Sequence, residues 1–280
     1  MVRALLLLLM LFSAAQAKVL RDLPYAGKES RALQKLDLFV PDPEYVGARP
    51  IVILIHGGGW VGGDKSNENF AEPKTSWLME QGFIVASLNY RLAPAAKHPA
   101  QVEDVCKAIA WMQKNAGHYG GNPERIWLLG HSAGAQLAAL AAVDDERQKA
   151  GGVNVAALRG VILLDGAGYD IPIQYASLNK RGVMDNIYRK AFTDDPEVQR
   201  NASPVHRVTT AKPPPFLILH LKQRPGSTAQ AKLLEAALKA KEGQVKVLAI
   251  EGKNHGTISA DCGKPGDPVT EAVAAFFKPG

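Results

Sequence analysis

The feature that most limits how this chain can fold is the sequence GHSAG, centred on Ser132. It follows an apolar run at residues 126–129 that predicts a buried strand, and it precedes an alanine-rich run at residues 135–142 that predicts a helix. The flanking glycines allow a sharp strand-to-helix turn that exposes the serine hydroxyl above the edge of a sheet. The N-terminus of the helix directs its N–H groups at the same point. The pattern predicts a nucleophilic serine, with an ordinary Gly/Ser turn as the alternative.

A second glycine-rich stretch also follows a predicted strand. Residues 51–55 are a continuous apolar run that leads into HGGGW, which begins at His56. The N–H groups of consecutive glycines can converge on one point, which suits the oxyanion of an acyl-transfer intermediate. We expect Gly57 and Gly58, together with Ala133 after the serine, to supply these N–H groups. A phosphate cradle is the alternative, but the Lys and Ser/Thr of a P-loop are missing.

The order of these motifs resembles that of the α/β-hydrolase fold. HGGGW, the sequence NYRLAP at residues 89–94 and GHSAG follow one another as in esterases and lipases related to hormone-sensitive lipase, and as in small feruloyl-esterase-like carboxylesterases. The resemblance covers most of the chain from about Tyr25 onward. It implies a mostly parallel central sheet with helices on both faces, and ester hydrolysis as the chemistry.

Alternating strand and helix patterns fill the rest of the chain and predict a parallel sheet covered on both faces. Residues 18–280 are expected to form one domain. Residues 169–215 are too long and too rich in proline for a simple connection, so we expect short helices there that form a small lid over the site. Further strands are expected at residues 31–40, 83–88, 161–164, 216–219 and 245–250, and helices at 73–81, 101–114, 232–240 and 269–277.

The candidate general base is His255, which follows the last predicted strand, where this fold places the histidine of its triad. Relatives usually carry the acid in the loop after the strand at residues 216–219. This chain has no carboxylate at residues 220–227. Asp165 ends the preceding strand, at a position that some other α/β-hydrolases use for their acid. We therefore expect Asp165 to be the third member of the triad.

Two alternatives to Asp165 as the acid stay open. Asp165 could instead cap its own loop, and Asp170 is then the second candidate. Gln223 could accept a hydrogen bond from His255, but an amide cannot stabilise the imidazolium by charge, and such a replacement can cost ~10⁴ in turnover. Arg224 beside it would repel the developing cation.

Three residues near the two glycine-rich motifs are candidates for the substrate pocket. Trp60 follows the glycines of HGGGW, Tyr90 lies in NYRLAP and His131 precedes the serine. Packing in the core is the alternative for both aromatic rings.

The charge of the chain excludes one class of partner. The 280 residues have a formal net charge of +6, but the Lys and Arg residues form no basic run. We therefore expect no nucleic-acid partner. No spacing of His, Cys and Asp suggests a metal site, and no cofactor is expected. The expected partner is a small-molecule ester, and the oligomeric state stays open.

The first residues predict a secretion signal. Arg3 supplies a positive charge, residues 4–12 an apolar segment, and the sequence AQA ending at Ala17 a cleavage site. A membrane anchor needs ~20 apolar residues, about twice the length present here. We expect a signal peptide at residues 1–17, no stable membrane anchor and a secreted or periplasmic protein.

Cys106 and Cys262 would permit one disulfide in an oxidising compartment. The first falls on a predicted helix and the second in the loop after His255, and these elements lie on opposite faces of the sheet in this fold. We therefore expect two free thiols.

The leading functional hypothesis is a secreted serine carboxylesterase. The short distance between the signal peptide and HGGGW leaves no room for an N-terminal helical cap, so we expect an open pocket and a preference for short-chain esters. The alternatives are a formamidase or peptidase-type hydrolase on the same fold, and a non-catalytic binding protein that lacks a complete triad.

Overall fold

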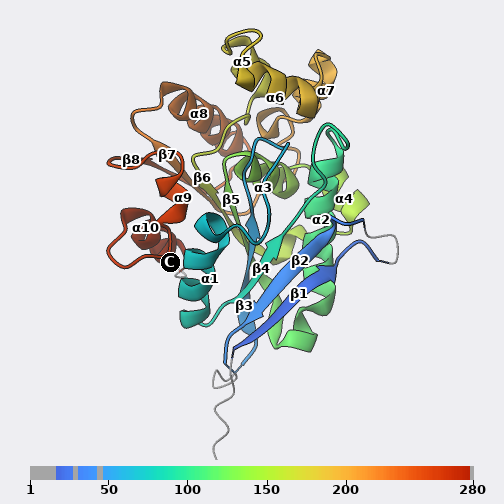
Figure 1. The fold of residues 1–280 in the computed structure, drawn as a ribbon, viewed down its shortest axis with the longest axis vertical. Helices are drawn as coiled ribbons and strands as arrows, with labels where there is room; N and C mark the ends of the chain where they lie inside the picture. The colour runs from blue at the N-terminus through green and yellow to red at the C-terminus, as the bar shows by residue number, and fades with distance from the viewer. Residues whose placement is uncertain (1–16, 28–30, 43–46, 278–280) are drawn as a thin grey trace, which may run out of the picture.

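An eight-stranded sheet crosses the molecule, in the order β1-β2-β4-β3-β5-β6-β7-β8 (Figure 1). The computed structural model describes residues 17–27, 31–42 and 47–277, so the signal peptide predicted at residues 1–17 lies almost entirely outside the described residues. Strand β2 pairs antiparallel with β1 and with β4, and the pairs from β4 to β8 are all parallel. The strands are β1 (Lys18–Pro24), β2 (Lys35–Val40), β3 (Arg49–Ile55), β4 (Ile84–Leu88), β5 (Gly121–His131), β6 (Leu158–Leu164), β7 (Phe216–Leu221) and β8 (Val245–Ile250).

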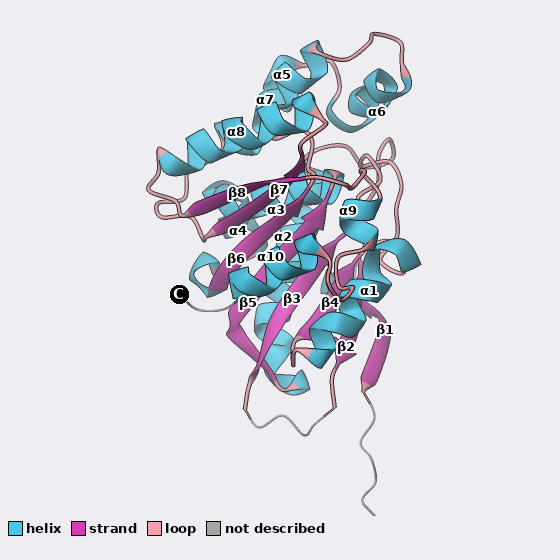
Figure 2. Ribbon diagram, turned by 90° about the vertical axis from the view of Figure 1, so that its left-hand side faces the viewer, coloured by secondary structure: helices cyan, strands magenta, loops and turns pink. Residues whose placement is uncertain are grey.

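Helices cover both faces of the sheet, as Figure 2 shows. Residues from α2, α3 and α8 form one buried apolar cluster, and residues from α1, α9 and α10 form the other. The central strand β3 is buried along its whole length and sends alternate side chains into the two clusters. These helices are α1 (Glu68–Glu80), α2 (Ala100–Asn115), α3 (Ala133–Val143), α8 (Pro225–Lys239), α9 (Thr257–Ala260) and α10 (Pro268–Phe277); the short α4 (Asp145–Gly151) follows α3.

This layered, mostly parallel arrangement confirms the predicted α/β-hydrolase class. Most predicted boundaries fall within a few residues of the observed ones, but two helices begin earlier than predicted. Helix α1 begins at Glu68 because the Asn67 side chain caps it by accepting a hydrogen bond from the N–H of Phe70, and it contains Pro73. Helix α8 begins at Pro225, whose missing N–H is harmless in the first turn.

The segment between β6 and β7 contains the short helices predicted there. They are α5 (Ile171–Ala176), α6 (Val183–Phe192) and α7 (Pro196–Asn201), and they gather at one end of the molecule (Figures 1 and 2). Helix α6 packs on the glycine loop, since a Cβ added at Gly59 would lie 3.0 Å from the side chain of Ile187. In the same region the ring centroids of Trp60 and Tyr188 are 5.2 Å apart.

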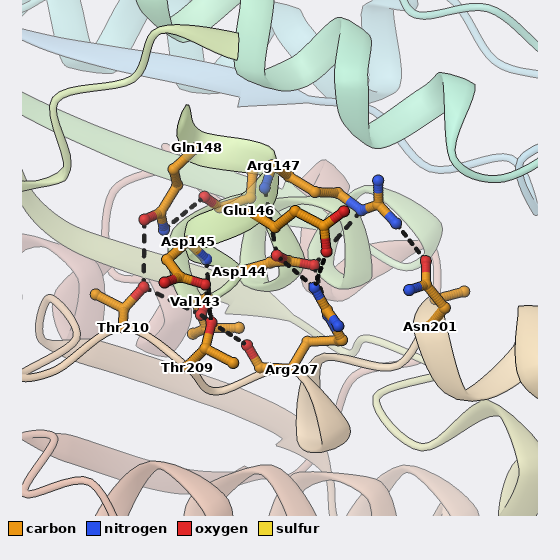
Figure 3. A network of polar contacts seen from close by, with 12 residues as sticks. Val143, Asp144, Asp145, Glu146, Arg147, Gln148, Asn201, Arg207, Thr209 and Thr210 are labelled. Carbon is orange, nitrogen blue, oxygen red and sulfur yellow. Dashed lines mark hydrogen bonds and ion pairs between the residues drawn. The ribbon is translucent and has the colours of Figure 1, made fainter. Parts of the chain in front are cut away.

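A polar network fastens the end of this segment to the C-terminus of α3 (Figure 3). Asp144 is fully buried there and accepts hydrogen bonds of 2.8 and 3.0 Å from Arg207. Arg147 donates to Asn201 at the end of α7. The buried carboxylate is therefore paired with a guanidinium of the segment, which ties the segment to the central helix.

Cys106 lies in one apolar cluster and Cys262 in the other, and both thiols are free. Among the described residues, no helix is long and apolar enough to cross a bilayer.

Candidate active site

The serine turn between β5 and α3 is tightly packed and strained. Ser132 has φ 56° and ψ −119°, a left-handed conformation that costs a non-glycine residue of order 1–3 kcal/mol. Its N–H donates to the carbonyl of Leu164 on the neighbouring strand β6 at 3.0 Å. A Cβ on Gly134 would lie 2.1 Å from the carbonyl oxygen of Ile55, so only glycine fits beside strand β3. The fold thus holds the half-buried serine in the sharp strand-to-helix turn that the GHSAG sequence predicts.

Three side chains from separate strand ends meet at this turn. His255 Nε2 lies 3.0 Å from Ser132 Oγ, and His255 Nδ1 lies 2.6 Å from Asp165 Oδ2. When Nδ1 carries the proton and donates to Asp165, Nε2 is free to accept from the serine hydroxyl. The arrangement is that of a nucleophile, a general base and the carboxylate that orients the base.

Asp165 is fully buried and well supplied with hydrogen-bond donors. Besides His255, it accepts hydrogen bonds from the N–H of Leu221 and the hydroxyl of Ser227, and it forms an ion pair with Arg224. Burial alone would raise the pKa of Asp165, but the hydrogen bonds from His255 and Ser227 and the charge of Arg224 outweigh it and lower the pKa to about 2. The carboxylate is therefore ionised at every pH near neutrality.

The other candidates for the acid do not face His255. Asp170 caps α5, accepting from the N–H of Ile173, and its second oxygen lies 3.1 Å from His206 Nε2. The amide of Gln223 donates to the carbonyl of Lys253. Sequence reasoning treated Arg224 as a charge that opposes the site, and it missed Ser227, because neither has a local signal for a partner more than 50 residues earlier in the chain.

The glycine loop lies directly beside the serine. A Cβ on Gly57 would lie 3.0 Å from Ser132 Cβ, so the backbone of the loop approaches the nucleophile as closely as glycine permits. Gly58 has φ 111°, which side chains rarely adopt, and its carbonyl accepts from the N–H groups of Val61 and Gly62 in a tight turn. Ala133 begins helix α3 immediately after the serine. Gly57 and Ala133 therefore both lie next to the serine, and the role of the three residues as oxyanion-hole donors stays a prediction.

His131 contacts the loop that carries His255. Its Nε2 lies 2.8 Å from the carbonyl oxygen of His255, and the two ring centroids are 4.7 Å apart. Burial, helped by the nearby charge of His255, lowers the pKa of His131 to about 3, so the ring is neutral and donates from Nε2. His131 also lines a groove of about 370 Å³ beside the site, with Gly57, Gly58, Phe70 and Gly256 among its walls.

Trp60 and Tyr90 are not pocket walls but core residues, as the packing alternative expects. Trp60 is 1% exposed and donates from Nε1 to Gln136 Oε1 at 2.9 Å. Tyr90 is fully buried, and its hydroxyl donates to the carbonyl of His56, on whose ring it stacks. Tyr90 thus holds His56 at the start of the glycine loop, and Trp60 anchors the end of HGGGW to Gln136 on α3. In the described part of the chain, no group of three or more His, Cys, Asp or Glu could hold a metal ion.

Comparison with known proteins gives the same picture. Residues 36–238 match the model of the BD-FAE family. Esterase LipC from Mycobacterium tuberculosis (strain ATCC 25618 / H37Rv) is 31% identical over 245 residues, which cover 81% of this chain and 58% of the relative. Esterase LipQ from the same organism is 34% identical over 231 residues, which cover 78% and 52%. The chain thus spans little more than half the length of these relatives.

A similar solved structure is Esterase B from Lactobacillus rhamnosis in a tributyrin phosphonate-inhibited form. Its TM-score is 0.69 at 23% identity, and the match covers 84% of this chain and 74% of that chain. At this identity the likeness concerns the fold, which it confirms.

Proposed function

The chain belongs to the BD-FAE family, and from that premise we propose that it is a serine carboxylesterase that hydrolyses short-chain esters through an acyl-enzyme intermediate. The observation that carries the proposal is the hydrogen-bonded series from Ser132 Oγ through His255 to the ionised carboxylate of Asp165. The names of the relatives support the same reaction class.

In the first half of the reaction, the Ser132 hydroxyl attacks the ester carbonyl while His255 Nε2 accepts its proton. The N–H groups of Gly57, Gly58 and Ala133 stabilise the oxyanion, and such donors are typically worth ~3–4 kcal/mol each in the barrier. Asp165 stabilises the imidazolium, which then gives the proton to the leaving alcohol. In the second half, water attacks the acyl-enzyme with His255 again as the base.

Two features support a small acyl group. In the described residues between Ala17 and Ile55 the chain forms the strands β1, β2 and β3 and no α-helix, so no α-helix from these residues builds a deep tunnel over the serine. The groove of about 370 Å³ lined by Gly57, His131 and Gly256, each next to a residue of the site or to its glycine loop, is at the small end of ligand clefts. Ile187 of helix α6 packs against Gly59 of the glycine loop and limits the space for a long acyl chain there.

We also propose that the protein is exported, because the charged and apolar residues before Ala17 have the pattern of a cleaved signal. Expression of the full chain followed by N-terminal sequencing of the exported protein tests this. An N-terminus at Lys18 supports the proposal, and an uncleaved cytoplasmic protein overturns it.

The function is tested by labelling the purified protein with a p-nitrophenyl butylphosphonate. A serine hydrolase acquires one phosphonyl group on the peptide that contains Ser132 and loses activity toward p-nitrophenyl butyrate in step. Ser132→Ala should keep the melting temperature of the wild type, because the hydroxyl contributes little packing, and should show neither labelling nor hydrolysis. Absence of labelling in the wild type would favour the binding-protein alternative. Faster turnover of N-formyl or peptide substrates than of esters would favour the other hydrolases.

A further inference from the structure

Arg224 contacts both the acid and the base of the proposed triad. It lies in the loop between β7 and α8 and immediately precedes α8. Its Nη1 forms an ion pair with Asp165 Oδ2, the same oxygen that lies 2.6 Å from His255 Nδ1. Nη1 also lies 2.7 Å from His255 Nδ1 itself. The guanidinium is 42% exposed, whereas the carboxylate is fully buried.

This geometry changes what Asp165 can do for His255. An unpaired carboxylate favours the protonated imidazole by charge, but a carboxylate that shares its oxygen with a guanidinium is already neutralised. The Nδ1 proton that His255 donates to Asp165 excludes a hydrogen bond from the guanidinium to the same nitrogen, so Arg224 acts on the ring through its charge. A guanidinium 2.7 Å from Nδ1 repels the imidazolium that forms when Nε2 takes the serine proton.

The other titratable groups around His255 are neutral or paired with other residues. His131 at the end of β5 has a pKa near 3 and is neutral. Tyr188 on α6 is held neutral by burial, which raises its pKa, while the charge of Arg224 acts in the opposite direction. Lys253, on the loop of His255, is paired with Asp261 and Asp267. Among the residues that the structure describes, Arg224 is the one cationic side chain within hydrogen-bond distance of His255.

Asp165 does not depend on Arg224 alone for its position. The hydroxyl of Ser227 and the N–H of Leu221 also donate to it, both to Oδ1, whereas Arg224 contacts Oδ2. Loss of the guanidinium should therefore leave the carboxylate in place while removing its counter-charge.

We propose that Arg224 is a positioning residue that sets the lower pH limit of activity by neutralising the carboxylate of Asp165 beside the His255 ring. The proposal rests on the serine-hydrolase function proposed above. The cation in the loop between β7 and α8 thereby extends the working range to lower pH.

The test is the pH profile of kcat/KM for p-nitrophenyl butyrate in the wild type, Arg224→Gln and Arg224→Lys. In Arg224→Gln the pH at which kcat/KM falls to half its plateau should rise by about 0.5–1 unit, since a neighbouring charge commonly has an effect of this size or larger. The plateau should change less than about fivefold, because Asp165 keeps its other donors. Arg224→Lys keeps the charge and should restore most of the wild-type profile.

Lys222→Gln is the matched control. Lys222 lies in the same loop and pairs with Glu251 at 2.6 Å, so the variant removes an equal charge that does not touch the triad. Its profile should coincide with that of the wild type. If Arg224→Gln does not fold, Arg224→Met, which keeps the aliphatic stem, replaces it.

The proposal is overturned if the acid limb of the kcat/KM profile does not move in Arg224→Gln or Arg224→Met. It is also overturned if this limb moves equally far in Lys222→Gln. Failure of the proposed function is distinguishable, because a protein that is not labelled by the phosphonate has no profile to shift. An active wild type with unmoved profiles contradicts only the role of Arg224.

Discussion

The Nε2 atom of His131 lies 2.8 Å from the carbonyl oxygen of His255, so the residue before the nucleophile holds the loop that carries the base. The contact joins the end of β5 to the turn before α9. Its direction is fixed because a neutral imidazole with a pKa near 3 must donate from Nε2 to bond a carbonyl. The distance between Ser132 and His255 therefore depends on a third side chain that touches neither of the reacting atoms.

His131→Ala should lower kcat about tenfold to a hundredfold with little change in KM. The reason is that loss of the donor allows the His255 loop to shift, and small displacements of a catalytic group are costly. Steady-state kinetics with p-nitrophenyl butyrate measure this. His118→Ala, at an exposed histidine in the short turn after α2, is the control and should match the wild type. A kcat unchanged in His131→Ala would show that the loop is held by other contacts.

Lys74 predicts an unusual dependence of stability on pH. Its ammonium is fully buried between α1 and α9 and donates to the carbonyls of Phe70 and Ser259, both at 2.6 Å. Burial lowers the pKa of Lys74 from 10.5 to about 8. Between those two values the unfolded chain binds more protons at this site than the folded chain, so the contribution of Lys74 to stability rises with pH. The rise amounts to ~3 kcal/mol.

Urea denaturation of the wild type and of Lys74→Met at pH 7 and pH 10 tests this. The thiol of Cys262 interacts electrostatically with Lys74, so the same comparison is also made in a Cys262→Ala background. The free energy of unfolding of the wild type relative to the variant should increase from pH 7 to pH 10. If this difference in the free energy of unfolding stays constant or falls as the pH rises, the hydrogen bonds to the two carbonyls fully offset the cost of burying the ammonium.

Sequence patterns predicted those parts of the site that depend on strand ends. Ser132, His255 and Asp165 each follow an apolar strand, and parallel strands bring their ends to one edge of the sheet. The burial of Trp60 depends instead on how the glycine loop folds back against α6, which no local pattern encodes. The pairing of Arg224 with Asp165 joins residues that are 59 positions apart, so no local pattern predicts it either. Charge along the sequence predicted that Arg224 repels the imidazolium, but not that Asp165 pairs with the guanidinium, because this carboxylate comes from another strand.

The acyl preference follows from the space around the serine. Esters with acyl chains of about two to six carbons should give the highest kcat/KM, because the neighbouring groove is small and Ile187 packs close to the glycine loop. A series of p-nitrophenyl esters from acetate to palmitate measures this. Ile187→Ala should move the optimum toward longer chains, and Ile173→Ala, at an exposed residue of α5, should leave it unchanged. A preference for palmitate over butyrate in the wild type contradicts the expectation.

The role of Asp165 is tested against the rival in the loop after β7. Asp165→Asn should lower kcat by about 10³–10⁴, because an amide neither fixes the productive tautomer of His255 nor stabilises its imidazolium by charge. Gln223→Ala should change kcat less than about tenfold, since its amide donates to the carbonyl of Lys253 and has no contact with the ring of His255 in the described structure. Active-site titration with the phosphonate gives the concentration of reactive enzyme, so a lower kcat can be distinguished from a smaller fraction of active protein.

The asparagine variant also separates orientation from charge. Asp165→Asn keeps a polar group of the same size between Ser227, Arg224 and His255, so the protein should fold, and its melting temperature checks this. The guanidinium of Arg224 then stands unneutralised beside His255 and opposes the imidazolium of the transition state. The double variant Asp165→Asn/Arg224→Gln removes this repulsion and should recover part of the lost kcat. A double variant no faster than Asp165→Asn would assign the whole loss to orientation of the ring, and an Asp165→Asn variant as active as the wild type would exclude Asp165 as the acid.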